Sequence, residues 1–152
     1  MPTVRVQHED FDAGAEIARL RGADARVGAV ASFIGVARDH NDGAAVGTLT
    51  LEHYPGMTER ALLDICAQAQ RRWDLLDLLV IHRVGELKPT DQIVLVVVTS
   101  SHRGEAFAAC QFVMDYLKTD APFWKKEATP AGTRWVEARA SDDAARNRWS
   151  RP

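Results

Sequence analysis

The chain has 152 residues, 46% of them hydrophobic, and its 19 Lys and Arg residues are nearly balanced by 21 Asp and Glu residues, so the formal net charge is −2. A chain of this length buries roughly 68–70% of its unfolded surface around one core, so we expect a single domain over residues 1–140 and a tail over residues 141–152 that can form a short helix. The near-neutral charge excludes a positive field over the whole surface that would attract nucleic acid or an anionic membrane. Any affinity for anions must therefore be local.

The N-terminal residues and the cysteines predict a cytoplasmic protein. The opening MPTVRVQHED lacks the apolar region of a secretory signal, and the longest apolar run, Ile93–Val98, is much shorter than the roughly 20 residues that span a bilayer. Cys66 and Cys110 lie far apart in the sequence among small apolar residues, which favours two reduced core thiols over the alternative, a disulfide. The five histidines show neither helical pairing nor a cysteine partner. We predict no metal and no cofactor.

Three strands and one helix are predicted in the first third of the chain. Val4 and Val6 alternate with polar residues, as in a half-buried strand, and a helix capped by Asp12 ends at Gly22. The segment Val27–Arg38 is apolar on both alternating faces, which predicts a central strand. A cleanly alternating strand follows over Val46–Tyr54, after the polar turn DHNDG.

The middle of the chain predicts a helix followed by two strands. The helix runs from about Thr58 to Trp73, and its apolar residues recur every fourth position: Met57, Ala61, Ile65, Ala69 and Trp73. A strand whose alternating face carries Leu78, Val80, His82 and Val84 stops at Gly85, and the β-branched segment DQIVLVVVTSS returns as its neighbour.

A third helix and a hairpin complete the pattern. The helix begins near Ser101, and its stripe is Phe107, Cys110, Met114 and Leu117. The segments FWKKEAT and TRWVEAR, joined by Pro130-Ala131-Gly132, indicate a hairpin, and SDDAARNRW could add a capped terminal helix. Strands outnumber helices and mix hairpins with crossovers, so the predicted class is α+β.

The segment TSSHRGE, Thr99–Glu105, passes from an apolar strand into a helix. A helix N-terminus offers unpaired N–H groups, and His102 and Arg103 add donors suited to phosphate. The alternative is that Ser100 or Ser101 only caps the helix and Arg103 is solvated. Arg38-Asp39-His40, at the end of a predicted strand, leaves a similar choice between a residue facing a cleft and a surface Arg–Asp pair worth about 0.5 kcal/mol.

Two lysines near the end of the third helix are candidates for acid–base or nucleophilic chemistry. Lys118 closes the last helical turn, where it also complements the helix dipole. In the extended segment after it, parity places Lys125 on the face of Phe123 and Glu127, and opposite to Trp124. If the two amines converge in a partly dry pocket, repulsion and desolvation lower their pKa values, which yields an amine that can act as base or nucleophile.

Six segments in order, GAVASFIGVARDHNDG, LEHYPGMTERAL, VIHRVGEL, VVVTSSHRGEAFAACQFVMDYLK, APFWKKE and RWVEAR, resemble the catalytic, large subunit of molybdopterin synthase from about Gly28 to Arg139. The resemblance implies an α+β fold with an α/β-hammerhead portion and a further antiparallel sheet. It implies an enzyme of molybdenum cofactor biosynthesis that converts cyclic pyranopterin monophosphate to the dithiolene of molybdopterin. The sulfur donor is the C-terminal thiocarboxylate of a small ubiquitin-like carrier protein, and two large subunits form a homodimer within a heterotetramer.

The resemblance also assigns roles to six residues. Lys118 matches the lysine at the carrier's C-terminus and Lys125 a second essential lysine. The residues that match the anion pocket for the substrate phosphate and pterin are Arg38, His102, Arg103 and Arg139. Sequence alone leaves open whether His102 and Arg139 serve their own chain or a neighbour in the dimer. Lys126 has no assigned role.

Two other classes of function fit parts of the same pattern. A phosphate-binding module without turnover would use the TSSHRGE corner and leave the lysines solvated. A structural subunit would use its apolar strands for assembly and would tolerate the loss of Lys118 and Arg38. Convergence of the two lysines and the serine-rich helix start around one concavity favours the enzyme.

Overall fold

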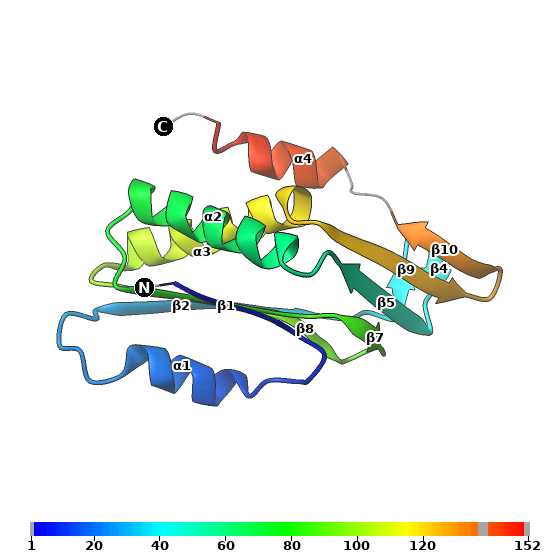
Figure 1. Ribbon diagram of the computed structural model, residues 1–152, viewed down its shortest axis with the longest axis horizontal. Coiled ribbons are helices and arrows are strands. Elements are labelled where there is room, and N and C mark those ends of the chain that lie inside the picture. The colour runs from blue at the N-terminus through cyan, green and yellow to red at the C-terminus, as the bar shows by residue number, and fades with distance from the viewer. Residues whose placement is uncertain (1, 137–139, 151–152) are drawn as a thin grey trace.

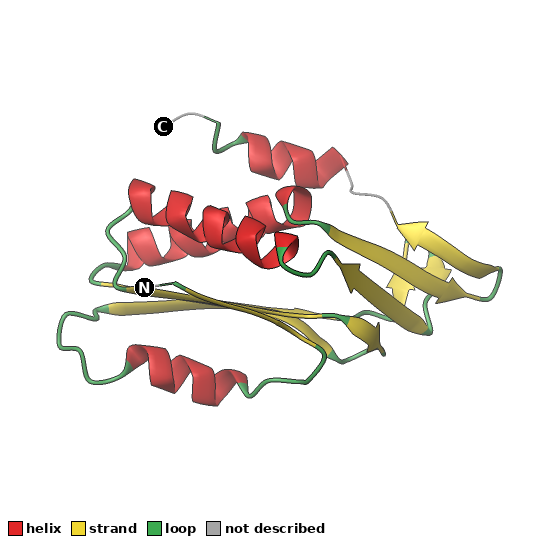
Figure 2. Ribbon diagram, in the orientation of Figure 1, coloured by secondary structure: helices red, strands yellow, loops and turns green. Residues whose placement is uncertain are grey.

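The described part of the chain, residues 2–136 and 140–150 of a computed structural model, forms ten strands and four helices (Figures 1 and 2). The strands are β1 (Thr3–Gln7), β2 (Ala29–Val36), β3 (His40–Asn41), β4 (Ala44–Ala45), β5 (Thr48–His53), β6 (Asp77–Arg83), β7 (Gly85–Leu87), β8 (Gln92–Ser100), β9 (Phe123–Thr129) and β10 (Gly132–Val136). The helices are α1 (Ala13–Arg21), α2 (Met57–Arg72), α3 (Arg103–Asp120) and α4 (Ala140–Asn147). The predicted α+β class is confirmed.

Two four-stranded sheets organise these elements. The first has the order β1-β6-β8-β2, in which β1 runs parallel to β6 and the other pairs are antiparallel. The second is antiparallel, with the order β10-β9-β5-β7, and the hairpin β3–β4 forms a separate ribbon. The predicted hairpin of FWKKEAT and TRWVEAR is therefore present as β9 and β10 as far as Val136, and the last three residues of TRWVEAR lie outside the described residues.

Helices cover both faces of the first sheet (Figure 1). On one face, α2 and α3 pack over Leu78, Val80 and Val96. On the other face, Leu20 of α1 and Phe11, just before that helix, pack over strand residues of opposite parity. The run Ile93–Val98 is apolar at successive positions because β8 is buried on both sides. Asp12 caps α1 by accepting a hydrogen bond from the Ala15 N–H, and Gly22 ends the helix with φ 52°.

Strand β2 lies at the edge of the first sheet, so the prediction that residues 27–38 form a central strand is wrong. Phe33, Ile34 and Val36 keep 42%, 38% and 47% of their surface exposed. An apolar sequence pattern on both faces of a strand indicates that the strand has apolar surface on both sides. It does not indicate whether that surface is covered by this chain or by another one. An exposed apolar edge strand is a favourable place for a second chain to bind.

The apolar stripes of α2 and α3 differ from the predicted ones at their first residues. Met57 is 50% exposed and Phe107 67% exposed, whereas the buried residues of α2 are Thr58, Leu62, Ile65, Cys66 and Ala69. In α2, four residues advance the helix by one turn plus about 40°, so a strict spacing of four drifts away from the buried face. The α3 stripe already mixes spacings of three and four, and its residues Cys110, Met114 and Leu117 are buried as predicted.

The end of α3 and the start of β9 join the helical layer to the second sheet. Thr58, buried at the start of α2, donates its hydroxyl to the Pro122 carbonyl at 2.9 Å and accepts from the Tyr54 N–H at 3.0 Å. These bonds fix the turn by which the chain passes from α3 into β9. None of the helices in the described residues is long and apolar enough to cross a membrane.

Candidate functional site

A cavity of about 450 Å³ lies where the C-terminal end of α3, the end of β2 and the second sheet meet. Lys118 reaches it from the last turn of α3, Lys125 from β9, and Arg38 from the segment after β2. The residues that close its apolar wall are Phe33, Ile34, Val94, Met114, Leu117 and Phe123. Three cationic side chains from separate parts of the sequence therefore share one concavity whose lining is partly apolar and partly polar.

The alternation of β9 decides which of its lysines reaches the cavity. Phe123, Lys125 and Glu127 line it, as parity predicts. Trp124 is 46% exposed, and the Lys126 ammonium lies 5.4 Å from the centre of the Trp135 ring. Lys126 thus contributes to the outer face of the sheet, which confirms the predicted separation of the two lysines.

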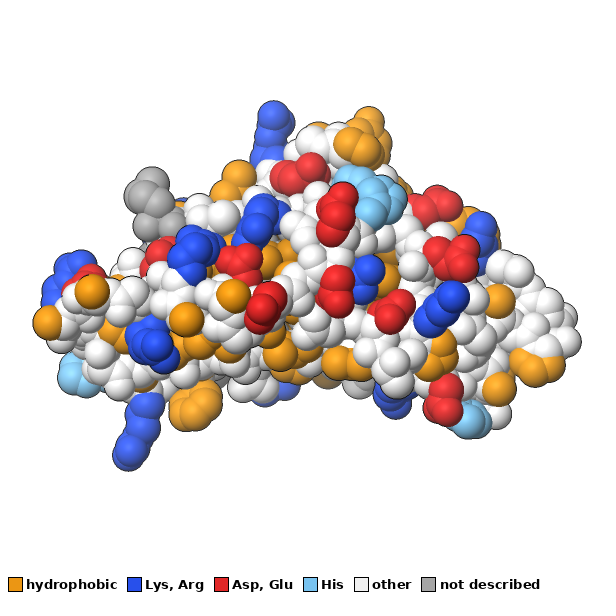
Figure 3. Space-filling view, turned by 90° about the horizontal axis from the view of Figure 1, so that it is seen from below, with side chains coloured by type: hydrophobic (Ala, Val, Ile, Leu, Met, Phe, Trp, Pro, Cys, Tyr) orange, Lys and Arg blue, Asp and Glu red, His pale blue; other side chains and the backbone are white. Residues whose placement is uncertain are grey.

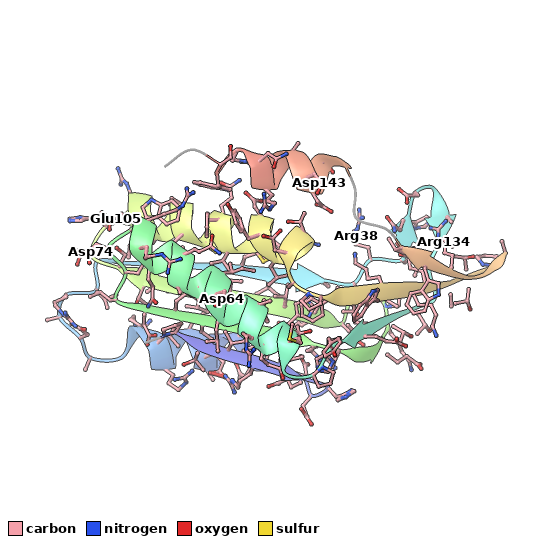
Figure 4. The ribbon with its side chains drawn as sticks, turned by 45° about the horizontal axis from the view of Figure 1, so that its top comes forward. Arg38, Asp64, Asp74, Glu105, Arg134 and Asp143 are labelled. Carbon is pink, nitrogen blue, oxygen red and sulfur yellow. The ribbon has the colours of Figure 1, made fainter. Side chains whose placement is uncertain are left out.

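The segment that carries Arg38 is held by backbone bonds to the β7–β8 connection. The Ala37 N–H donates to the Asp91 carbonyl at 2.9 Å, and the Thr90 N–H donates to the Ala37 carbonyl at 2.8 Å. Asp39 pairs with His40 at 2.8 Å, and this hydrogen bond lowers the pKa of the Asp39 carboxyl. Arg38 itself lies at the end of the molecule that carries β9 and β10 (Figure 4), where it faces the cavity.

A buried carboxylate clamps the β3–β4 hairpin against β9. Glu127 is only 5% exposed, and its two oxygens each accept from the Asn41 side-chain amide at 3.1 Å. Arg134 of β10 donates to Glu127 at 3.2 Å and to the Asn41 carbonyl at 2.8 Å. This network encloses one side of the cavity. Strand alternation predicts the face of Glu127 correctly, whereas Asn41 and Arg134 were not predicted because their pairing joins positions far apart in the chain.

His82 was assigned only to a strand face by the sequence, yet it lines the cavity beside both lysines. It is 5% exposed, and its ring stacks on Phe123 with centroids 3.9 Å apart. Burial is the main reason that the pKa of His82 falls to about 4, and the charges of Lys118 and Lys125 act in the same direction. The sequence does contain a signal for this site residue, because His82 is a polar residue on the apolar strand face that carries Leu78 and Val80.

His102 and Arg103 lie away from this cavity in the same chain. They stand at the start of α3, and the 16 residues from His102 to Lys118 correspond to roughly 24 Å of helix. Figure 4 shows the separation, with Glu105 of the first turn of α3 at one end of the molecule and Arg38 at the other. Arg139 lies outside the described residues.

The start of α3 also differs from the expected serine cap. His102 is the N-cap residue and makes no side-chain capping bond. Ser100 is fully buried and donates its hydroxyl to the Asp74 carbonyl at 2.9 Å, which ties the strand end to the α2–β6 connection. Ser101, His102 and Arg103 are exposed, so their side chains are accessible to an anion or to another chain.

The sequence is similar to those of known proteins over nearly its whole length. The family model described as MoaE protein matches residues 6–120. The chain belongs to the MoaE family. The molybdopterin synthase catalytic subunit of Ralstonia nicotianae is 66% identical to this MoaE chain over 149 residues, which cover 98% of this chain and 85% of the relative.

Solved structures of MoaE-type proteins have the same fold. A molybdopterin biosynthesis MoaE protein from Burkholderia ambifaria superposes with a TM-score of 0.85 at 56% identity and covers 100% of both chains. A protein complex of subunits 1 and 2 of molybdopterin-converting factor from Helicobacter pylori matches with a TM-score of 0.70 over 91% of each chain; at 17% identity it shows the fold alone.

The two cysteines of this MoaE chain are expected to be unreactive thiols. Cys66 and Cys110 are buried free thiols. Desolvation raises the pKa of Cys66 to about 12 and that of Cys110 to about 11, so neither forms an appreciable thiolate near neutral pH. Among the residues that the structure describes, no cluster of three or more His, Cys, Asp or Glu side chains is placed to hold a metal ion.

Proposed function

We propose that this chain is the sulfur-transferring subunit of a molybdopterin synthase. It converts cyclic pyranopterin monophosphate to the dithiolene of molybdopterin, using sulfur from the C-terminal thiocarboxylate of a small ubiquitin-like carrier. The observation that carries the proposal is the convergence of Lys118, Lys125 and Arg38 on one cavity in a chain of the MoaE family. The relatives named catalytic subunit support the reaction type.

The three cations divide the work according to their chemistry. Arg38, a permanently charged guanidinium with planar donors, binds the precursor's phosphate and so orients the ring carbon. The thiocarboxylate sulfur attacks that carbon and forms a C–S bond while the carbon–oxygen bond to the phosphate breaks, so the displaced electron pair leaves on the phosphate oxygen that Arg38 holds. The carrier's acyl group remains attached to the transferred sulfur as a thioester. Lys118 then accepts the acyl group or moves the proton as this thioester is cleaved, while Lys125 stabilises the negative charge that develops. Water completes the release of the carrier carboxylate.

A flexible carrier tail fits the form of the cavity. A C-terminal Gly-Gly segment has no side chains, so it can pass between the apolar wall and the lysines, which attract its terminal anion. The fold relative from Helicobacter pylori is described as a complex of two subunits. By analogy, the carrier is the partner of this chain.

A second copy of this chain supplies the remaining anion-binding residues. Because His102 and Arg103 lie roughly 24 Å along α3 from Lys118, they cannot reach the same substrate as Lys118 within one chain. A homodimer that brings one subunit's α3 start to the other's cavity unites them, and Arg139 belongs to the same assembled pocket. The exposed apolar edge of β2 is suited to such an interface. With a carrier on each subunit, the assembly is a heterotetramer.

The surface and the thiols agree with a cytoplasmic location. On the face seen in Figure 3, Lys and Arg side chains are interspersed with Asp and Glu side chains. Because the two signs of charge are mixed, this face should not attract an anionic membrane. Two buried free thiols suit a reducing compartment. We therefore assign the reaction to the cytoplasm.

Reconstitution with thiocarboxylated carrier and the cyclic precursor, followed by mass, tests the proposal. The parent protein should form dithiolene. Lys118→Ala should lower the rate by about a hundredfold or more, as expected for a group that transfers protons or acyl groups. Lys126→Ala is the matched control, because Lys126 lies on the opposite face of β9 and should leave the rate unchanged.

The same experiment separates the two other classes of function. A phosphate-binding module binds the precursor without turnover, and a structural subunit keeps assembling when Lys118 and Arg38 are lost. If Lys118→Ala makes product at the parental rate, the catalytic assignment is wrong.

A further inference from the structure

His82 presents an unused hydrogen-bond acceptor to the cavity. Its Nδ1 lies 2.8 Å from the Arg83 carbonyl oxygen, and because a carbonyl can only accept, Nδ1 carries the proton. In the neutral ring Nε2 is then a bare acceptor. The stack on Phe123 holds the ring in place.

Nε2 is not sealed in the core. Among the described residues, the fully buried side-chain polar atoms without a partner are Arg5 Nε and Thr99 Oγ1. His82 is bonded through Nδ1, and its residue lines the cavity, so its second nitrogen is accessible from that cavity. The residue is only 5% exposed, and its Nδ1 is bonded to the backbone of the strand. Its Nε2 can therefore accept a hydrogen bond from a ligand in the cavity.

The neighbours of His82 keep it uncharged. Burial lowers its pKa to about 4, and Lys118 from α3, Lys125 from β9 and His53 from β5 act in the same direction, against the opposing effect of the Arg83 carbonyl. Lys118, Lys125 and Arg38 can only donate hydrogen bonds when charged. A fixed acceptor in the same cavity, close enough to Lys118 and Lys125 to feel their charges, therefore adds a polarity that the cations cannot supply.

We infer that Nε2 of His82 positions the substrate by accepting a hydrogen bond from an N–H group of the ligand in the cavity. This inference rests on the proposed function. Two sources carry that chemistry, an N–H group of the pterin precursor and a backbone amide of the carrier's C-terminal tail. In either case the bond fixes the ligand's orientation relative to Lys118 and Lys125.

Two substitutions separate the two nitrogens of His82. The amide of Asn in His82→Asn reaches the Nδ1 position, so this variant keeps a donor for the Arg83 carbonyl and loses the acceptor in the cavity. The longer Gln in His82→Gln places its amide near Nε2, so this variant keeps the cavity acceptor and loses the strand bond. His82→Asn should therefore bind the ligand more weakly than His82→Gln, and His82→Gln should be the less stable of the two proteins.

Calorimetry with the parent protein and both variants tests the inference, using the cyclic precursor and the carboxylate-terminated carrier as separate probes. His82→Asn should weaken the binding of one probe by about tenfold, the loss expected for one hydrogen bond, whereas His82→Gln should stay close to the parent. The probe that is affected identifies the source of the N–H group. The melting temperature should fall at least as far in His82→Gln as in His82→Asn.

Other results overturn the inference. If His82→Gln binds worse than His82→Asn, the strand bond matters and His82 is only structural. If neither variant changes the affinity for either probe, or the parent binds neither, Nε2 has no ligand. Turnover is read separately: a parent protein that binds both probes and forms no dithiolene contradicts the proposed function and leaves the binding comparison for His82 intact.

Discussion

Glu127 shows how one side chain determines the shape of a site without reacting. Its carboxylate is almost fully buried and is balanced by Arg134 and the Asn41 amide. Glu127→Gln keeps the size of the side chain but removes its charge and one acceptor, so the free energy of unfolding should fall by about 1–2 kcal/mol. The loss is no larger because Arg134 is partly solvated, which weakens its ion pair with Glu127. Urea unfolding measures the change. Glu52→Gln, an exposed position on the neighbouring strand, is the control and should change the free energy little.

The buried thiols lead to a second prediction at the residue scale. Since desolvation holds the pKa of Cys66 and Cys110 at about 12 and about 11, a thiol reagent at pH 8 should label the folded protein very slowly and the unfolded protein quickly. The double variant Cys66→Ala, Cys110→Ala should keep the full catalytic rate, because the sulfur arrives on the carrier. A rate that drops with this variant, in a protein still folded by circular dichroism, would show that a cysteine takes part in the transfer.

At the scale of elements, the contact between β2 and the β8–α3 junction is a point of close approach. The Gly28 N–H donates to the Ser100 carbonyl at 3.0 Å, and a Cβ at Gly28 would lie 2.2 Å from the Ser101 carbonyl oxygen. Gly28→Ala should therefore lower the free energy of unfolding by about 1–3 kcal/mol. Gly104→Ala, in the first turn of α3 with open space around it, should raise it by about 0.5–1 kcal/mol. Equal effects of the two substitutions in thermal unfolding would contradict this account.

Elements were predictable from the sequence where a local cause acts alone. The cap at Asp12, the end at Gly22 and the alternation of Phe123, Lys125 and Glu127 follow from backbone geometry within a few residues. The position of β2 was not predictable in this way, because the order of strands depends on pairings between distant segments. An apolar strand indicates burial equally well when the covering surface belongs to another chain.

The candidate site was predictable only in part, for reasons that belong to the whole molecule. Lys118 and Lys125 are close in sequence and reach one cavity, but Arg38 joins them because the segment after β2 reaches the same cavity as the start of β9. The separation of His102 from Lys118 follows from the length of α3, which the sequence already contained. The resemblance assigns Lys118, Lys125, Arg38, His102 and Arg103 to one pocket, whereas the structure holds the first three at one cavity and the last two at the far end of α3. We propose that a second copy of the chain brings the two groups together.

Acid stability of the whole molecule follows from His82. Its pKa is about 4 in the folded protein and 6.5 in the unfolded chain, so between these values the unfolded state binds more protons. The stabilisation is fully present above about pH 6.5 and is lost as the pH falls toward 4, by about 3 kcal/mol in total. The carboxylates of Asp10 and Glu16, whose pKa values are lowered, act mainly below about pH 4.5. Urea unfolding at pH 7 and at pH 4.5 should therefore show a decline in stability that is much smaller in His82→Gln, and an equal decline in both proteins would mean that His82 is not the buried neutral base described.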